Sequence, residues 1–242
     1  MEVVAVTSAG GVRIWLDVPY AHKDAAKAAG ARWDPAAKSW YAPRPGMTAL
    51  AGWTPLPELL PGEDREFGSG LFVDPVPRGC WFTNVRSAVS PAFWDRLRTM
   101  VYRRAGYRCE ACGADRDAEA GRFLEAHERW RYLQYRESGR LVQRLERLVC
   151  LCTWCHRSTH FGHARVTGVE QQALDHLCAV NRWDPPTARA HVERAAAAWE
   201  RRSQHTWELD LSILTNAGVP VVTPEATERA WVAADRLRRA QG

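Results

Sequence analysis

Two short cysteine knuckles, one on either side of a long insert, constrain the fold of this chain most. Both have the spacing Cys-x2-Cys, and they are formed by Cys109, Cys112, Cys152 and Cys155. Two such turns bring four thiolates to one tetrahedral ion, for which this ligand set and spacing favour zinc. His156 and His160 could replace two of the cysteines, but a four-cysteine site is simpler and leaves both histidines free for other chemistry.

Length and composition indicate a globular protein. The chain has 242 residues, of which 46% are hydrophobic, enough for one large domain or two small ones. It lacks an apolar run near the ~20 residues of a membrane span and a signal-peptide pattern at its start. Seven cysteines, four of them in metal-type spacing, fit a reducing compartment. We therefore expect a cytoplasmic protein with no membrane partner, in which Cys80, Cys150 and Cys178 are buried as small hydrophobic residues.

The basic residues are mostly arginine, and several of them precede the first knuckle. The net charge is +5, and arginine binds phosphate groups in a bidentate manner. We expect DNA as the partner, and the candidate phosphate contacts are Arg103, Arg104, Arg108 and Arg147. A solvated helix face, or for Arg147 a surface-facing strand position, is the simpler alternative.

Residues 1–45 are predicted to form a small α+β domain, and residues 46–78 a linker rich in proline and glycine. A strand over 12–18, a helix over 23–29 and a closing strand over 38–41 are expected. Three tryptophans either form a miniature core or serve as exposed platforms for stacking bases, namely Trp15, Trp33 and Trp40. This unit resembles a small domain of uncharacterised function that occurs on plasmid primases and relaxases, which implies a DNA-processing setting.

The remaining periodicities predict strands between the knuckles and helices around them. A helix over 90–105 leads to the first knuckle, strands over 122–132 and 141–151 form a hairpin, and a helix follows Cys152. That helix places His156 and His160 one turn apart on the same face. Further helices are expected over 169–180, from 185 to about 203, and over 223–239, with a strand or packing arm over 207–214.

A hairpin followed by a helix, with a zinc site at its base, resembles the HNH nuclease family. The paired knuckles, the His-x3-His of the helix and the triplet Ala126-His127-Glu128 carry the resemblance, which extends over roughly residues 79–219. It implies an α+β fold: a ββα-metal core stapled by the four-cysteine zinc site, with C-terminal helices, beside the small N-terminal α+β domain. Residues 220–242 are expected to add a C-terminal helix.

The resemblance implies the chemistry of phosphodiester hydrolysis by an activated water molecule. His156 and His160 stand at the positions of ligands to a catalytic divalent ion, which would be magnesium, manganese or zinc. His127 is either the general base or a further ligand. If His127 is a ligand, Glu128 must act as the base. In a regular strand only one of these two neighbours faces the site, whereas a bulge admits both.

Two departures from the family pattern leave two functions open. Ala126 stands where the family usually has a ligand, and Arg147 stands where it usually has an asparagine that orients the hairpin. The expected function is a metal-dependent HNH-type endonuclease acting on DNA. The alternative is a zinc-stabilised nucleic-acid-binding protein of the same fold that has lost cleavage.

Overall fold

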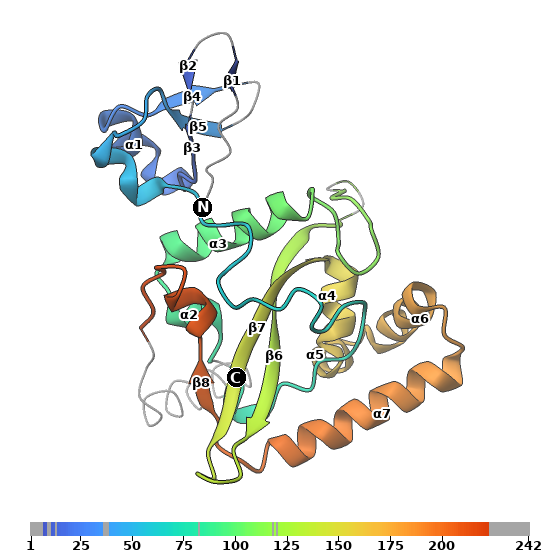
Figure 1. Cartoon of the computed structure of the whole chain (residues 1–242). Coiled ribbons are helices and arrows are strands. Elements are labelled where there is room, and N and C mark those ends of the chain that lie inside the picture. Colours follow the sequence, from blue (N-terminus) through green and yellow to red (C-terminus); the bar gives the residue numbers. More distant parts are fainter. Residues whose placement is uncertain are drawn as a thin grey trace, which may run out of the picture.

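The larger part of the chain is built around one long hairpin, with a small N-terminal unit beside it (Figure 1). The computed structural model describes residues 7–8, 11–12, 14–35, 39–81, 83–117, 119 and 121–222. The strands are β1 (Thr7–Ser8), β2 (Gly11–Val12), β3 (Ile14–Leu16), β4 (Arg32–Asp34), β5 (Ser39–Ala42), β6 (Leu124–Gln134), β7 (Leu141–Cys152) and β8 (Glu208–Asp210). The helices are α1 (Lys23–Ala28), α2 (Val85–Ala88), α3 (Pro91–Arg104), α4 (Thr153–Thr159), α5 (Phe161–Val166), α6 (Glu170–Asn181), α7 (Pro185–Arg202) and α8 (Ser212–Thr215), with 3₁₀ turns η1 (Tyr20–His22), η2 (Thr48–Trp53) and η3 (Arg78–Cys80).

The hairpin of β6 and β7 confirms the two strands expected between the knuckles. The strands pair antiparallel from Leu124 opposite Cys152 to Gln134 opposite Leu141, with a shift of register between Arg129 and Trp130. β8 adds a short parallel strand along β7. Because β7 ends at Cys152 and α4 begins at the next residue, the second knuckle joins the hairpin directly to the helix.

The last part of strand β7 is buried on both faces, which explains the unbroken apolar run over residues 148–152. Leu148 and Cys150 pack in a core shared with α3 and α8, whereas Val149 and Leu151 pack in a second core shared with α4 and α6. Alternate residues of a strand point to opposite faces, so each core receives every second residue. The sheet is therefore a central layer between two groups of helices.

The helices begin where the capping signals of the sequence place them. The Ser90 side chain accepts a hydrogen bond from the Phe93 amide at the start of α3, and Asp184 accepts one from Thr187 at the start of α7. A proline follows each cap at the first helical position. The helices expected over 90–105, 169–180 and 185–203 are confirmed, and the segment 207–214 forms β8 and the start of α8. The helix expected over 223–239 lies outside the described residues.

The N-terminal unit is a three-stranded sheet of order β3-β5-β4 with α1 packed on it. Its core consists of small and aliphatic residues, including Leu16, Ala26 and Leu50, while Trp40 packs against the edge of this core. Trp33 is 48% exposed and meets Trp40 edge to face, at 5.6 Å between ring centroids. The expectation of a tryptophan core therefore holds for Trp40 and not for Trp33.

The segment 46–78, expected to be a linker, is packed structure. Leu50 belongs to the core of the N-terminal unit, whereas Leu56, Leu60 and Leu71 are buried in the cores of the larger unit. The glycines of this segment provide left-handed turns, as Gly62 does at a φ of 87°. Proline and glycine thus shape turns between buried leucines, and we call residues 54–78 the strap.

The strap is fastened to the hairpin by a buried ion pair. Both terminal nitrogens of Arg104 lie 2.7 Å from the carboxylate of Glu63, and the two side chains are 1% and 0% exposed. Glu63 also accepts hydrogen bonds from the Leu60 and Leu148 amides. Since Leu148 belongs to β7, this pair connects α3, the strap and the hairpin.

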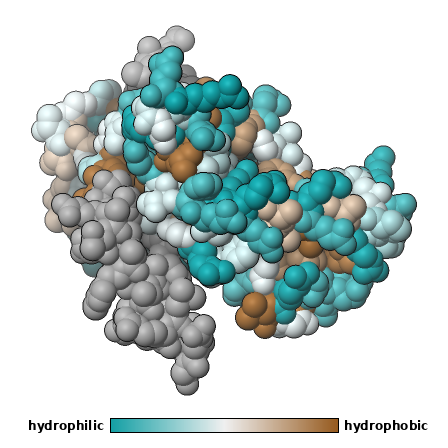
Figure 2. Space-filling view, turned by 90° about the horizontal axis from the view of Figure 1, so that it is seen from below, coloured by the Kyte–Doolittle hydropathy of each residue, from teal (hydrophilic) through white to brown (hydrophobic). Residues whose placement is uncertain are grey.

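On the face shown in Figure 2, hydrophobic residues form small separate patches among hydrophilic ones. Among the described residues, no helix has the length and apolar character that crossing a bilayer requires.

Replacing Arg104 by alanine is expected to lower the free energy of unfolding by about 3–5 kcal/mol, because the change leaves the Glu63 carboxylate buried without its partner. Urea unfolding followed by tryptophan fluorescence measures the loss. The control is Arg165→Ala, which removes the exposed Arg165–Glu170 pair and should cost less than about 1 kcal/mol. Equal losses in the two variants would contradict the structural importance of the buried pair.

Candidate functional site

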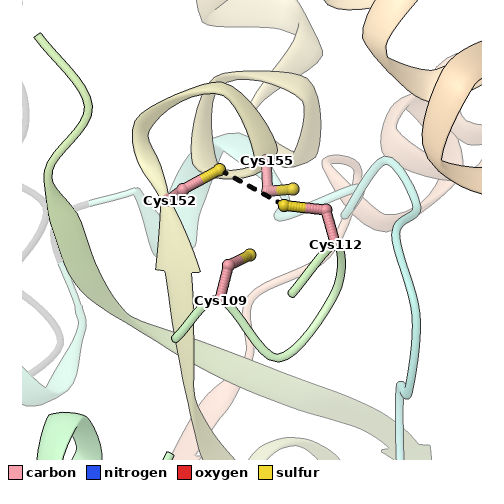
Figure 3. Close-up of side chains that lie close together, drawn as sticks. All are labelled: Cys109, Cys112, Cys152 and Cys155. Carbon is pink, nitrogen blue, oxygen red and sulfur yellow. Dashed lines mark hydrogen bonds between the residues drawn. The ribbon is translucent and has the colours of Figure 1, made fainter. Parts of the chain in front are cut away.

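The four cysteines of the knuckles come together at the base of the hairpin (Figure 3). Cys109 and Cys112 lie on the turn after α3, Cys152 ends β7, and Cys155 lies in α4. Their sulfur atoms are all within 4.8 Å of one another, and in Figure 3 they point toward a common centre. The expected group of cysteines is therefore assembled.

The spacing of the sulfur atoms fits a tetrahedral metal ion. The Sγ atoms of Cys112 and Cys152 are 3.7 Å apart, and ligands at the usual zinc–sulfur distance would be about 3.8 Å apart. Burial and the charge of neighbouring thiolates raise the pKa of Cys112 to about 11. Four thiolates at such distances need a cation to balance their charge, so this cluster could hold a metal ion.

His176 contacts this cluster, and the sequence did not predict that contact. Nε2 of His176, in α6, lies 3.1 Å from Sγ of Cys155. Donation of a ring N–H to a ligand sulfur is a common way of orienting a metal ligand. The spacing of the cysteines could not reveal this contact, because His176 comes from a later helix.

A second group of metal-binding side chains lies where the hairpin meets α4. The ligand atoms of His127, His156 and His160 lie within 4.8 Å of one another. Their ring centroids are 4.6 to 5.4 Å apart. His127 is on β6, His156 is in α4, and His160 is the residue between α4 and α5, whose amide still bonds to the His156 carbonyl at 3.0 Å. The three histidines singled out in the sequence thus form one cluster.

The electrostatics favour neutral imidazoles at His127 and His160. Burial and the nearby positive groups lower the pKa of His160 to about 3 and lower that of His127 well below its usual value. Neither ring nitrogen of the buried His127 has a hydrogen-bond partner among the described residues. Neutral imidazoles with unused nitrogens are the form in which histidine binds metal ions.

Three carboxylates surround the histidines. Nδ1 of His156 lies 3.0 Å from Oε2 of Glu125, and Nε2 of His127 lies 3.7 Å from Oδ2 of Asp74. Glu128 accepts a hydrogen bond from the Val85 amide, the first residue of α2, at 3.1 Å. Burial raises the pKa of the Glu128 carboxyl to about 7.

The histidines line a cleft that contains both charged and aromatic groups. The cleft has a volume of about 420 Å³. Its lining includes the three histidines, Glu125, Glu128, Ala126, Arg86, Arg98, Trp81 and Trp94. Glu128 reaches the cleft together with its neighbour His127, although the change of register of β6 comes only after Arg129. A regular strand was expected to bring only one of these two side chains to the site, but both line the cleft.

The arginines expected to bind phosphate are largely engaged within the protein. Arg104 and Arg147 are buried, the first paired with Glu63 and the second with Glu110 at 2.7 Å. Arg103 pairs with Asp17 of the N-terminal unit at 2.9 Å, and Arg108 pairs with Asp115 on the surface at 3.1 Å. The structure gives Arg104 and Arg147 a structural role in place of the expected phosphate contact, because their charges are balanced inside.

Several residues of the site were missed in the sequence for physical reasons. Glu125 could have been found, since it is two residues before His127 on the same strand and so lies on the same face. Asp74 gave no usable signal, because it lies in a proline-rich stretch far from the knuckles. Arg98 belongs to the run of arginines before the first knuckle, whose exposed members only the fold distinguishes, and Arg86 lies ahead of that run.

Comparison with known proteins identifies the N-terminal unit. Residues 13–55 match a family described as a domain of unknown function (DUF5710). Two proteins named DNA primase TraC, from Escherichia coli, are 54% and 57% identical to this chain over 44 residues. The match covers 18% of this chain and only 4% and 3% of the two primases. No solved structure matches the chain. The expected resemblance of the N-terminal domain to plasmid primase segments is thereby confirmed, and the match extends to η2.

Replacing Cys109 by serine is expected to remove one metal ion per chain and to destabilise the protein, because three thiolates hold the ion less tightly than four. Elemental analysis of the purified protein and its melting temperature measure the two effects. Cys178→Ser is the control, since Cys178 is a partly buried cysteine of α6 outside the cluster. If metal-free wild-type protein melts at the same temperature as metal-loaded wild-type protein, the cysteine cluster does not hold a structural ion.

Proposed function

We propose that this protein is a metal-dependent endonuclease of HNH type that hydrolyses phosphodiester bonds in DNA. The observation that carries the proposal is the convergence of His127, His156 and His160, from a hairpin and the helix that follows it, on a cleft with basic and aromatic lining. In this proposal the four-cysteine cluster holds a structural zinc ion and fixes the hairpin to the helix.

The three histidines fit a divalent ion. They lie close together and are partly to fully buried, and the ring nitrogens of His127 make no hydrogen bond among the described residues. The pKa values of His127 and His160 are lowered, so these two rings favour the neutral form that binds metal ions. A donor set of three imidazoles favours a transition-metal ion such as zinc over magnesium. A divalent ion bound there would neutralise the charge that develops on the scissile phosphate and on the leaving oxygen.

This arrangement supports one of the two roles considered for His127. The ring of His127 lies 4.8 Å from that of His160 and 5.4 Å from that of His156, centroid to centroid, which suits a shared ion. We therefore assign His127 as a ligand and Glu128 as the general base. The Val85 amide holds one carboxylate oxygen of Glu128 at 3.1 Å, and the other oxygen can accept a proton from the attacking water.

The cleft offers positive groups for the DNA backbone. Arg86 is exposed, and Arg98 is 43% exposed while paired with Asp95 at 2.8 Å. Both line the cleft beside the histidines, so a phosphate group could approach the ion between them. The N-terminal domain supports DNA as the substrate, because its matched relatives carry the name DNA primase.

Purified wild-type protein is expected to nick or linearise supercoiled plasmid DNA with manganese, zinc or magnesium, whereas His127→Ala should lose at least about 100-fold in rate through loss of the ion. Agarose gels of time courses measure the rate. His163→Ala is the matched control, since His163 is an exposed histidine of α5 just beyond the cluster, and it should cleave like wild type.

Absence of wild-type cleavage with each of these ions, on both double-stranded and single-stranded DNA, would overturn the proposal. If the same protein still shifted DNA in a gel, the binding-only alternative would stand in its place.

Glu128→Gln is expected to keep the second metal ion but to reduce cleavage about 100- to 10,000-fold, because glutamine accepts the Val85 hydrogen bond and cannot take the proton from water. Metal content and cleavage rate are measured on the same preparation. Glu125→Gln is the comparison, since Glu125 contacts His156 and should affect ion affinity first. A Glu128→Gln enzyme with wild-type rate would return the role of base to His127.

A further inference from the structure

Asp74 brings a buried carboxylate from the strap to the histidine cluster. Its Oδ2 lies 3.7 Å from Nε2 of His127, and the two side chains are 5% and 2% exposed. Its backbone amide donates to the carbonyl of Thr159, the last residue of α4, at 3.0 Å. The strap is therefore joined both to the end of the helix that carries His156 and to the strand that carries His127.

Arg129 fixes this part of the strap from the hairpin side. Its guanidinium lies 4.0 Å from the ring centroid of Phe72, and it donates to the Gly70 carbonyl at 3.4 Å. Arg129 is two residues after His127, so both side chains are on the same face of β6. The face that presents His127 to the cluster thus also holds the segment around Asp74.

Asp74 is suited to contact His127 without joining the ligand group. The ligand atoms that lie within 4.8 Å of one another are those of the three histidines, and Asp74 is not among them. A neighbouring pair shows the same relationship at closer range, since Nδ1 of His156 lies 3.0 Å from Glu125. A carboxylate that accepts the N–H of a ligand histidine fixes its tautomer and orientation.

We propose that Asp74 is the positioning residue of His127: its carboxylate accepts the Nε2 proton, so that Nδ1 of His127 faces the ion. The inference rests on the proposed function, because it assigns the ion to the histidine cluster. The chain would thus obtain from the strap a carboxylate for the site, in addition to Glu125 and Glu128 of the hairpin.

The test uses the full chain with its cysteine site filled by zinc, titrated with cobalt(II) and followed by visible absorption and calorimetry. Asp74→Asn is expected to weaken cobalt binding about 10- to 100-fold, because the amide can no longer hold the Nε2 proton as a charged acceptor. Asp175→Asn is the control, since Asp175 is an exposed aspartate of α6 and should bind cobalt like wild type.

A second readout needs no variant. Two-bond proton–nitrogen spectra of the wild-type protein with zinc in the histidine cluster should show His127 protonated at Nε2 and bound through Nδ1. A His127 bound through Nε2, or an Asp74→Asn protein with wild-type cobalt affinity, would overturn this inference and leave the proposed function intact. If the His156→Ala variant binds cobalt like the wild type, the proposed function is overturned, and the inference with it.

Discussion

The register of the β6–β7 pairing determines the position of almost every other feature. In this register His127 lies opposite Val149, and Leu124 lies opposite Cys152, so the end of the hairpin, the second knuckle and the start of α4 coincide. A slip of one residue would turn every side chain of a strand to the other face. The burial of β7 on both faces makes such a slip costly, because apolar residues of either core would exchange places with those of the other.

Two groups of side chains that could hold a metal ion lie along this hairpin. The cysteines lie at its base and tie the turn after α3 to α4, while the histidines lie one step further along, where the strand faces the helix. Each carboxylate around the histidines has its own neighbour: the partly exposed Glu125 contacts His156, the buried Asp74 lies near His127, and Glu128 accepts a hydrogen bond from α2. Such a preorganised set reduces the rearrangement that binding an ion and a phosphate would require.

The sequence predicted the local elements well because their signals are local. Proline after Ser90 and Asp184 marks helix starts, and the two knuckles with alternating apolar residues mark the hairpin. Spacing predicted the four cysteines and the pairing of His156 with His160, because it reports the ligand geometry, whereas His127 was predicted from the resemblance to the HNH family. The sequence could not predict Asp74 or the burial of Arg104 and Arg147, since these depend on contacts between segments far apart in the chain. The strap was misjudged for a related reason: proline and glycine are typical of linkers, but the leucines between them are what decides burial.

The strap also bears on where the boundary between the N-terminal unit and the hairpin unit lies. The match to the domain family ends at residue 55, where the strap follows η2 and begins to bury leucines against the hairpin. Residues 13–55 are the segment that matches the domain family, whereas the strap packs with the hairpin unit. A hairpin unit excised at residue 79, as composition alone suggests, would lose the partner of Arg104, three core leucines and the acidic neighbour of His127. The boundary between the two units therefore lies near residue 55, inside the segment 46–78 and well before its end.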